Sequence, residues 1–259
     1  MKIESVGFIG GGRVVKIILK GWERSGAMPR KVVVSDPDNA VIEALATAIP
    51  GIETSTNNGI SAAQDLCVLA VHPPLVKDVA SALGSTLDAE KQMLVSLAPK
   101  FTTAKLTELL GGFSRIARMI PNASSYINEG YNPIAFAEGV SETDCDNVRE
   151  LFAPLGNGPV VDESTLEAYA IVTAMGPTYF WPQFYCLKAL GESFGLSPDA
   201  SMEAVAKTIK ASVDMLTNTG LSEADIEDLV PVKPLAGDVE ELCKAMDVKL
   251  RNVMEKLRP

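Results

Sequence analysis

The sequence is poor in the residues that build metal sites and disulfide frameworks. Of its 259 residues one is histidine and four are cysteine, and no two cysteines form a C-x-x-C pair. The single histidine, His72, is far in sequence from most of the cysteines, which are Cys67, Cys145, Cys186 and Cys243. Such scattered residues argue against a metal site and against disulfide pairing, so we expect no metal and reduced, mostly packed thiols.

Positive charge and long apolar runs are also lacking. The 23 basic residues are outnumbered by 33 acidic ones, for a net charge of −10, which disfavours nucleic-acid and anionic-membrane partners. No apolar run is long enough to span a membrane, and the first strand is too short and glycine-rich for a signal peptide. We therefore expect a cytoplasmic protein with a small-molecule partner. The hydrophobic fraction of 47% predicts a globular chain of one large or two moderate domains.

The chain does have, near its start, a short apolar strand that runs into three glycines and then into an amphipathic helix. Gly10 and Gly12 fill the first two glycine places of G-x-G-x-x-G, and Val15 takes the third. Side chains would block a pyrophosphate from the first N–H groups of the helix, so glycines here suit dinucleotide binding. The residues predicted to contact a cofactor in this stretch are Gly10, Gly11, Gly12, Arg13 and Val14. The alternative is an ordinary strand–turn–helix.

A second apolar strand over residues 31–35 ends at Ser35 and is followed by Asp36, 24 positions after Gly12. An acid at this point accepts hydrogen bonds from an adenosine ribose and repels a 2′-phosphate, which favours NAD over NADP. The alternative is that Asp36 and Asp38 only form the turn and N-cap of a helix over residues 39–48. Both interpretations assign Ser35 and Asp36 to the edge of the cofactor site or its flanking turn.

Strands and helices continue to alternate up to residue 161. Further strands are predicted at residues 52–54, 65–71, 93–97 and 115–119. This alternation predicts a doubly wound parallel sheet of the Rossmann type over residues 1–161, with helices on both faces. The breaks at His72–Pro73 and Ala98–Pro99 should lie beside the glycine loop, because ligands bind beyond the carboxyl ends of such strands.

From residue 162 to 259 only helical periodicity is present, which predicts an all-helical second domain. Five of the 15 aromatic residues crowd into positions 179–185. This cluster indicates a core or subunit-contact helix, and a substrate pocket is the alternative. We expect at least a homodimer, because the helical half has more apolar faces than its few helices can hide.

Several motifs taken together resemble the pyrroline-5-carboxylate reductase family, the last enzyme of proline synthesis. The resembling stretches are Gly7-Phe8-Ile9-Gly10-Gly11-Gly12, Leu69-Ala70-Val71-His72-Pro73, Ser96-Leu97-Ala98, Arg118-Met119-Ile120-Pro121-Asn122 and Gly176-Pro177-Thr178-Tyr179. The resemblance implies a Rossmann domain, a helical dimerisation domain, NADP or NAD as cofactor, and reduction of a C=N bond. It further implies cofactor contacts from Ala70, Val71, His72, Pro73, Ala98 and Asn122.

The sequence departs from this family where the family binds its substrate. Thr173-Ala174-Met175 stands in place of S-G-S, and Lys233-Pro234-Leu235-Ala236-Gly237-Asp238 stands in place of S-P-G-G-T-T. The small hydroxyl and glycine groups that would hold the carboxylate of a cyclic imino acid are largely missing. The resemblance therefore implies the fold and the cofactor, whereas the substrate is altered.

These observations lead to a first hypothesis, an NAD(P)H-dependent reductase of a small imine. Thr178 and Tyr179 are the hydroxyl groups expected at the reacting atoms, and Met175, Gly176 and Pro177 are expected at the substrate. Lys233 is either a partner for a substrate carboxylate or a solvated loop lysine. The alternative is a non-catalytic dinucleotide-binding protein with an assembly or regulatory role. A weaker alternative is reduction of a C=O bond or use of a deazaflavin cofactor.

Overall fold

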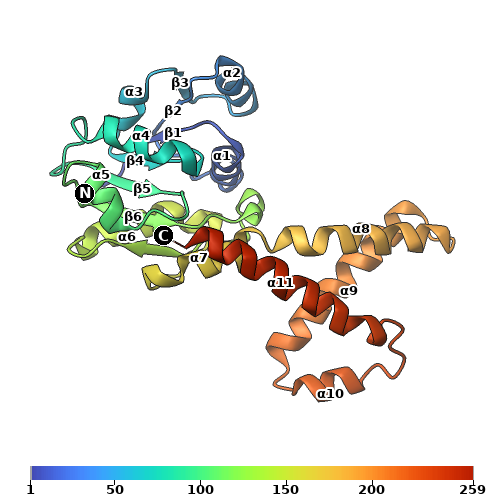
Figure 1. The fold of residues 1–259 in the computed structure, drawn as a ribbon. Helices are drawn as coiled ribbons and strands as arrows, with labels where there is room; N and C mark the ends of the chain where they lie inside the picture. The colour runs from blue at the N-terminus through green and yellow to red at the C-terminus, as the bar shows by residue number, and fades with distance from the viewer. Residues whose placement is uncertain (1, 259) are drawn as a thin grey trace. The chain divides into compact units, whose positions relative to one another are not determined.

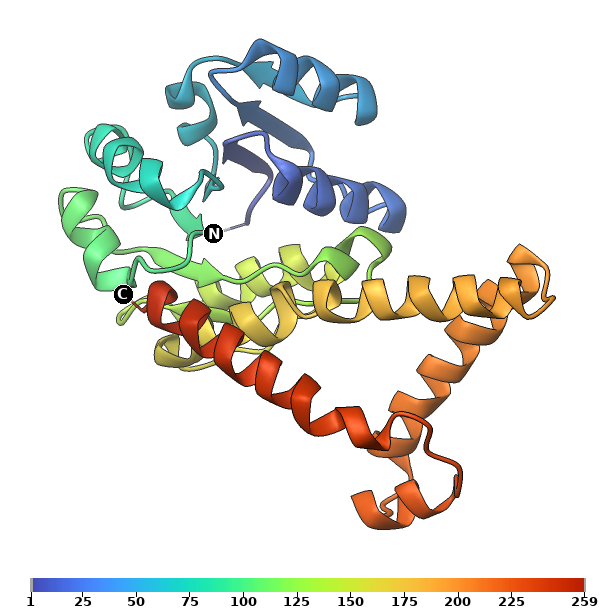
Figure 2. The ribbon, with the colours of Figure 1, turned by 45° about the vertical axis from the view of Figure 1, so that its right-hand side comes forward.

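The computed structural model describes residues 2–258, which form two compact units. The first contains residues 2–175 and 254–258, and the second contains residues 176–253. Figures 1 and 2 show the strands of the first unit and the long helices of the second. Each unit is described by itself below.

The first unit is built on a seven-stranded sheet with the order β3-β2-β1-β4-β5-β6-β8. Its strands are β1 (Ser5–Ile9), β2 (Lys31–Ser35), β3 (Glu53–Ser55), β4 (Leu66–Leu69), β5 (Met93–Ser96), β6 (Ile116–Met119) and β8 (Ile134–Phe136). The first six run parallel, and β1 lies at the centre, paired with β2 on one side and β4 on the other. The chain therefore reverses its direction of winding at β1 and β4, which is where such sheets bind ligands.

Helices cover both faces of this sheet, and a separate apolar core lies on each face. The helices and helical turns are α1 (Arg13–Ser25), α2 (Asn39–Ala48), α3 (Asn58–Ala62), α4 (Pro73–Leu83), α5 (Thr103–Leu109), η1 (Ala123–Ile127), α6 (Glu142–Phe152) and η2 (Ala153–Leu155). One core contains Phe8, Trp22 and Phe152, and the other contains Cys67 and Leu106. Burial of such side chains stabilises the domain by about 1.5–3 kcal/mol each.

The predicted doubly wound sheet is confirmed, with one edge that the sequence did not predict. β8 runs antiparallel to β6, and the two-residue strands β7 (Gly130–Tyr131) and β9 (Gly156–Asn157) pair with each other. Segments of two or three residues are too short to show an alternating or continuous apolar pattern. The helix predicted over residues 39–48 is present with those bounds.

The first unit ends in η3 (Glu163–Thr165), α7 (Leu166–Tyr169) and the π-helix η4 (Ala170–Ala174). The division between the compact units follows Met175, later than the change of pattern at residue 161 from which we predicted the domain boundary. Glu163 and Glu167 bind Arg118 on β6, and Leu166 and Ile171 of the same segment are buried. These ion pairs tie the first helical turns after residue 161 to the sheet.

The second unit is helical, as predicted for this part of the chain. It contains α8 (Pro177–Ser193), α9 (Pro198–Asn218), α10 (Glu223–Asp228), η5 (Ala236–Asp238) and most of α11 (Val239–Leu257). Ser197 caps α9, and Ser222 and Asp225 form a capping box at α10, which satisfies N–H groups at both helix starts. Among the described residues, no helix has the length and hydropathy to cross a membrane.

Candidate dinucleotide site

A cavity of about 430 Å³ opens at the carboxyl ends of β1, β4 and β5. Its lining brings together eight of the residues that the sequence predicts at a cofactor. They are Gly12, Arg13, Val14, Ala70, Val71, His72, Pro73 and Ala98, joined by Leu97 and Pro99. The one histidine of the sequence, His72, is part of this lining. Three strand ends that are distant in sequence thus meet at one concave site.

The glycine loop fits a pyrophosphate by its backbone. Gly10 has φ +100°, and a Cβ there would lie 2.7 Å from the Ala70 carbonyl oxygen, so both conformation and space require glycine. Gly12 is the N-cap of α1 without a side-chain cap, and a Cβ there would meet no atom within 4 Å. The first turn of α1 also carries no acidic residue. An uncapped helix start facing open space is the arrangement that binds anionic phosphates.

Val15, which replaces the third glycine of the motif, does not crowd this cavity. Its side chain is completely buried in the core between α1 and the sheet, and it is absent from the cavity lining. The helix therefore accommodates a larger residue at this place without narrowing the site.

Asp36 lies next to the glycine loop, at the end of β2. Its Oδ2 atom accepts the Gly11 N–H at 2.8 Å, and its Oδ1 atom accepts the Asp38 N–H at 3.0 Å. Ser35 is buried and donates its hydroxyl to Asn58 at 2.9 Å, which fixes the end of β2. Asp36 thus braces the turn, and its carboxylate lies beside the glycine loop.

His72 and Ala98 form the sides of the cavity from β4 and β5. His72 is the N-cap of α4, and Pro73 is the first residue of that helix, where its missing N–H is not needed. Ala98 and Leu97 follow β5 and are buried, and the Ala98 N–H donates to Ser96 Oγ at 3.3 Å. The two sides of the cavity are therefore formed by the segments that directly follow β4 and β5.

Asn122 is buried after β6 and uses its polar groups within the first unit. Its backbone N–H donates to Asn132 Oδ1 at 2.8 Å, and its own Oδ1 accepts the Ser124 N–H at 2.8 Å. Its Nδ2 atom donates to the Thr173 carbonyl. Asn122 thus holds the π-helix η4 against the end of β6, and it does not line the cavity.

The predicted catalytic and substrate residues lie at the start of the second unit. Met175 ends the first unit, Gly176 is the N-cap of α8, and Pro177, Thr178 and Tyr179 form its first turn. Burial raises the pKa of the Tyr179 hydroxyl above its usual range, so this group stays protonated at neutral pH.

Lys233 lies apart from these residues in the loop after α10. Its Nζ atom lies 3.4 Å from Glu227 Oε2, and its side chain is largely exposed. Glu227 therefore competes with a substrate carboxylate for this lysine.

Sequence reasoning missed a buried charge cluster behind the β5 end of the cavity. Arg118, 1% exposed, binds Glu163 and Glu167, which in turn accept hydrogen bonds from the loop after β5. The signal was an arginine within the otherwise apolar strand Ile116–Met119, because a buried charge requires a partner.

A separate cavity of about 530 Å³ beside α6 contains none of the predicted site residues.

Comparison with known proteins extends these observations. A family model described as NADP oxidoreductase, coenzyme F420-dependent, matches residues 5–100. Pyrroline-5-carboxylate reductase from Pisum sativum is 27% identical over 224 residues, which cover 86% of this chain and 81% of that protein. The pyrroline-5-carboxylate reductase structure from Coxiella burnetii covers both chains completely, with 23% identity and a TM-score of 0.78. That of Plasmodium falciparum, with NADP bound, covers 99% of this chain and 96% of that chain, with 22% identity and a TM-score of 0.80.

The sheet order, the glycine loop and the cavity at the strand ends define a Rossmann-type dinucleotide-binding protein. Over most of its length the chain is similar to proteins named pyrroline-5-carboxylate reductase.

Proposed function

We propose that the protein is an NAD(P)H-dependent reductase of a C=N bond in a small imine. The observation that carries this proposal is the cavity in which the glycine loop, the His72 turn and the loop after β5 converge. Its fit to a dinucleotide rests on Gly10, whose conformation requires glycine, and on Gly12, which leaves open space at the start of α1. The relatives named pyrroline-5-carboxylate reductase support the reaction class.

In this proposal each element of the site has a distinct role. Gly10, Gly11, Gly12, Arg13 and Val14 hold the pyrophosphate at the start of α1. Ser35 and Asp36 lie toward the adenosine ribose, and the walls from β4 and β5 hold the nicotinamide half, because a dinucleotide lies across both halves of such a sheet. Asn122 acts through the Thr173 carbonyl, which it positions by a hydrogen bond. The two walls consist of Ala70, Val71, His72, Pro73 and Ala98.

A bound reduced nicotinamide supplies a hydride, which is transferred to the imine carbon while the nitrogen holds a proton, so that C=N becomes CH–NH and NAD(P)⁺ is formed. An imine whose pKa is near neutrality arrives partly protonated, so a strong acid is not required. Tyr179, which burial keeps protonated, and Thr178 are the hydroxyl groups proposed to orient the nitrogen. Met175, Gly176 and Pro177 are proposed to contact the substrate, and Lys233 to attract its carboxylate.

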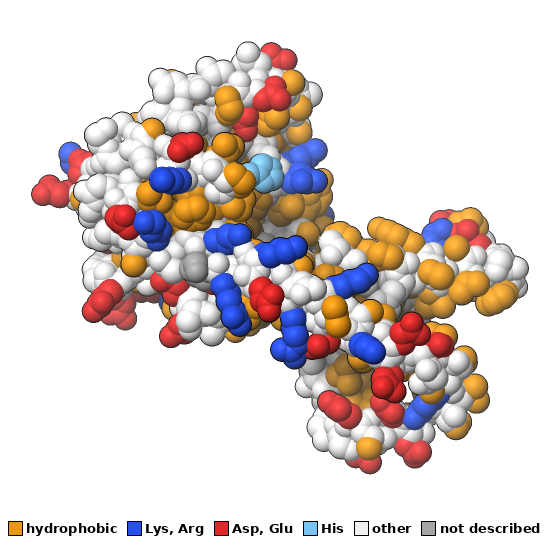
Figure 3. All heavy atoms as spheres, viewed as in Figure 1, with side chains coloured by type: hydrophobic (Ala, Val, Ile, Leu, Met, Phe, Trp, Pro, Cys, Tyr) orange, Lys and Arg blue, Asp and Glu red, His pale blue; other side chains and the backbone are white. Residues whose placement is uncertain are grey.

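We further propose a cytoplasmic homodimer. All four cysteines are free thiols, which suits a reducing compartment. Large apolar side chains of α8, including Trp181 and Tyr185, are exposed at 43% and 62%, and Figure 3 shows hydrophobic side chains gathered over this helix. Contiguous exposed apolar surface of this kind favours a subunit contact.

The test is dinucleotide binding by calorimetry, followed by NAD(P)H oxidation with pyrroline-5-carboxylate and related imines. Gly12→Asp should weaken dinucleotide binding by roughly 1,000-fold, because a carboxylate about 4 Å from a phosphate is repelled by about 4 kcal/mol near a protein surface. Aspartate is also a good N-cap, so this variant should fold.

Gly158→Asp is the matched control, since Gly158 is exposed and a Cβ there makes only ordinary contact, 3.4 Å from Asn132. Equal affinity in both variants and the wild type would remove the glycine loop from the site. Tight dinucleotide binding without oxidation by any imine would instead favour the non-catalytic alternative.

A further inference from the structure

The loop between β5 and α5 contains a strained residue beside the cavity. Lys100 has φ +76°, a left-handed conformation that a residue with a Cβ rarely adopts. It directly follows Leu97, Ala98 and Pro99, which line the cavity. The side chain of Lys100 is exposed, so its packing does not account for this conformation.

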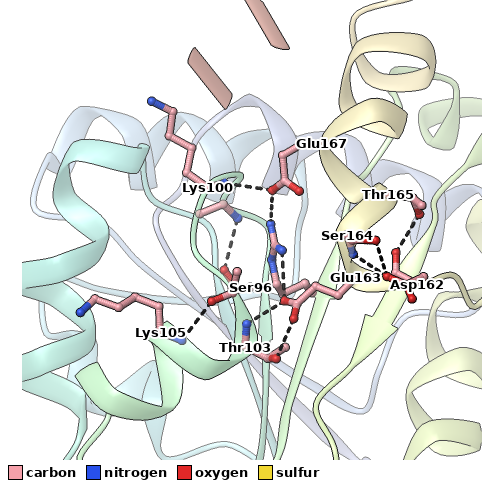
Figure 4. Close-up of polar contacts among 12 residues, drawn as sticks. Ser96, Lys100, Thr103, Lys105, Asp162, Glu163, Ser164, Thr165 and Glu167 are labelled. Atoms are coloured by element: carbon pink, nitrogen blue, oxygen red, sulfur yellow. Dashed lines mark hydrogen bonds and ion pairs between the residues drawn. The ribbon is translucent and has the colours of Figure 1, made fainter. Parts of the chain in front are cut away.

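Two carboxylates, the buried Glu167 and the partly exposed Glu163, hold this loop by its backbone. The Lys100 N–H donates to Glu167 Oε1 at 3.2 Å, and the Thr103 N–H donates to Glu163 Oε1 at 2.7 Å. The Thr103 hydroxyl donates to Glu163 Oε2 at 2.9 Å. Figure 4 shows Glu163 and Glu167 facing Thr103 and Lys100 across this cluster. Each end of the loop turn is therefore fixed to the segment that follows residue 162.

Arg118 fixes the two carboxylates in turn. Its Nη1 atom lies 3.0 Å from Glu163 Oε1, and its Nη2 atom lies 2.5 Å from Glu167 Oε1. The Glu167 and Arg118 side chains are 3% and 1% exposed, so water screens this pair very little. Among the described residues, the buried Nε atom of Arg118 has no hydrogen-bond partner, so the guanidinium is held through Nη1 and Nη2.

We infer that Arg118 and Glu167 are positioning residues for the cofactor site. Through the Lys100 N–H they hold a strained turn, and the turn sets the wall of residues 97–99 against the nicotinamide half of the dinucleotide. This inference rests on the proposed function for the identity of the ligand. A buried ion pair is weak evidence for stability, because its desolvation offsets its attraction, whereas fixed geometry is a role that it fills well.

The test compares two substitutions at Lys100, which change the conformational preference without touching the buried cluster. Lys100→Val should weaken binding of the preferred dinucleotide, NADH or NADPH, by about tenfold, because a β-branched residue resists positive φ. Lys100→Gly should stay within about twofold of the wild type, because glycine adopts this conformation freely. Both variants remove the same charge, so a direct effect of the ammonium group would appear equally in the two.

A second pair of variants tests the carboxylate. Glu167→Gln should weaken dinucleotide binding and speed hydrogen exchange of residues 97–103. The double variant with Lys100→Gly should recover most of the lost affinity, which a role in stability alone would not produce. Glu108→Gln is the matched control, since Glu108 forms an exposed ion pair with Lys105 on α5.

The outcomes separate the two proposals. If the wild type binds a dinucleotide and the valine and glycine variants bind it equally, the positioning role is wrong and the proposed function stands. If the wild type binds neither NADH nor NADPH, both proposals are wrong. Slower or unchanged exchange of residues 97–103 in Glu167→Gln also contradicts the positioning role.

Discussion

Asp36 supports local structure, and we expect it to influence which cofactor binds. Its two oxygens accept backbone N–H groups of Gly11 and Asp38, so the carboxylate is held beside the glycine loop. No basic residue lies between Ser35 and Val41 to neutralise a 2′-phosphate. The position therefore favours the cofactor that lacks this phosphate.

We predict that Asp36→Asn raises the affinity for NADPH relative to NADH by roughly fivefold, by relieving repulsion worth about 1 kcal/mol. The amide oxygen of asparagine can still accept the Gly11 N–H, whereas the bond from the Asp38 N–H is lost. The measurement is the ratio of the two dissociation constants. Asp38→Asn is the control, because Asp38 caps α2 through the Ala40 N–H at 2.9 Å. A ratio equal to that of the wild type would make Asp36 a turn residue only.

At the scale of elements, the attachment of α6 to β6 depends on an ion pair. Asp144 in the first turn of α6 lies 2.8 Å from Arg115, and both side chains are less than one-fifth exposed. Burial acts to raise the pKa of Asp144, but hydrogen bonds from Ser141 and Arg115 and the charge of Arg115 outweigh it, so the pKa is lowered. The ionised carboxylate therefore stabilises the folded state.

The sign of the pH dependence follows from this lowered pKa. The stabilisation is fully present above the ordinary pKa of 3.8 and is lost as the pH falls from there through the lower folded value. We predict that Asp144→Asn lowers the free energy of unfolding by about 1–2 kcal/mol at pH 7, and that the difference from wild type shrinks below pH 4. Urea unfolding across this range measures it.

Asp146→Asn is the control for this prediction, because Asp146 and Arg149 form an ion pair that is about half exposed. Such pairs contribute at most about 1 kcal/mol. An Asp144→Asn difference that stays constant down to pH 2 would contradict the assigned role of ionisation.

How much the sequence predicts depends on how local each interaction is. The buried strands β4 and β5 are continuous apolar runs, and the breaks after them mark the cavity, so both were predictable. The ion pairs of Arg118 join residues 45 and 49 positions apart, which no local pattern contains. The motif that includes Arg118 supports the family resemblance. The ion-pair partners of Arg118 could be identified only from the folded structure.

For the whole molecule, the exposure of the helical unit predicts association. No side chain of α8 is buried, and α9 buries only Ser201 and Val205 among its described residues. Helices gain most of their stability from packing an apolar face, which this unit does not provide alone. We predict a dimer or larger assembly in light scattering at low micromolar concentration, and a monomer of 27.5 kDa would contradict it.

The stretch over residues 233–238 is where this sequence departs from the motifs of the family that it resembles. Leu235 is 72% exposed and stands with Asp238 in the stretch that replaces S-P-G-G-T-T, so apolar bulk and negative charge replace groups suited to a carboxylate. Each lost hydrogen bond to a charged group costs about 1.5–3 kcal/mol, so the loss of several weakens binding by roughly three decades.

We therefore predict poor activity on pyrroline-5-carboxylate, with a less acidic or differently shaped imine as the better substrate. Leu235→Gly combined with Asp238→Thr should raise kcat/KM for pyrroline-5-carboxylate, because the pair restores backbone access and a hydroxyl while removing a like charge. Leu229→Gly, at an exposed leucine outside this stretch, is the control for general loosening. A wild-type kcat/KM of about 10⁴ M⁻¹s⁻¹ or better would show that other residues hold the carboxylate, since this is an ordinary rate for an enzyme on its own substrate.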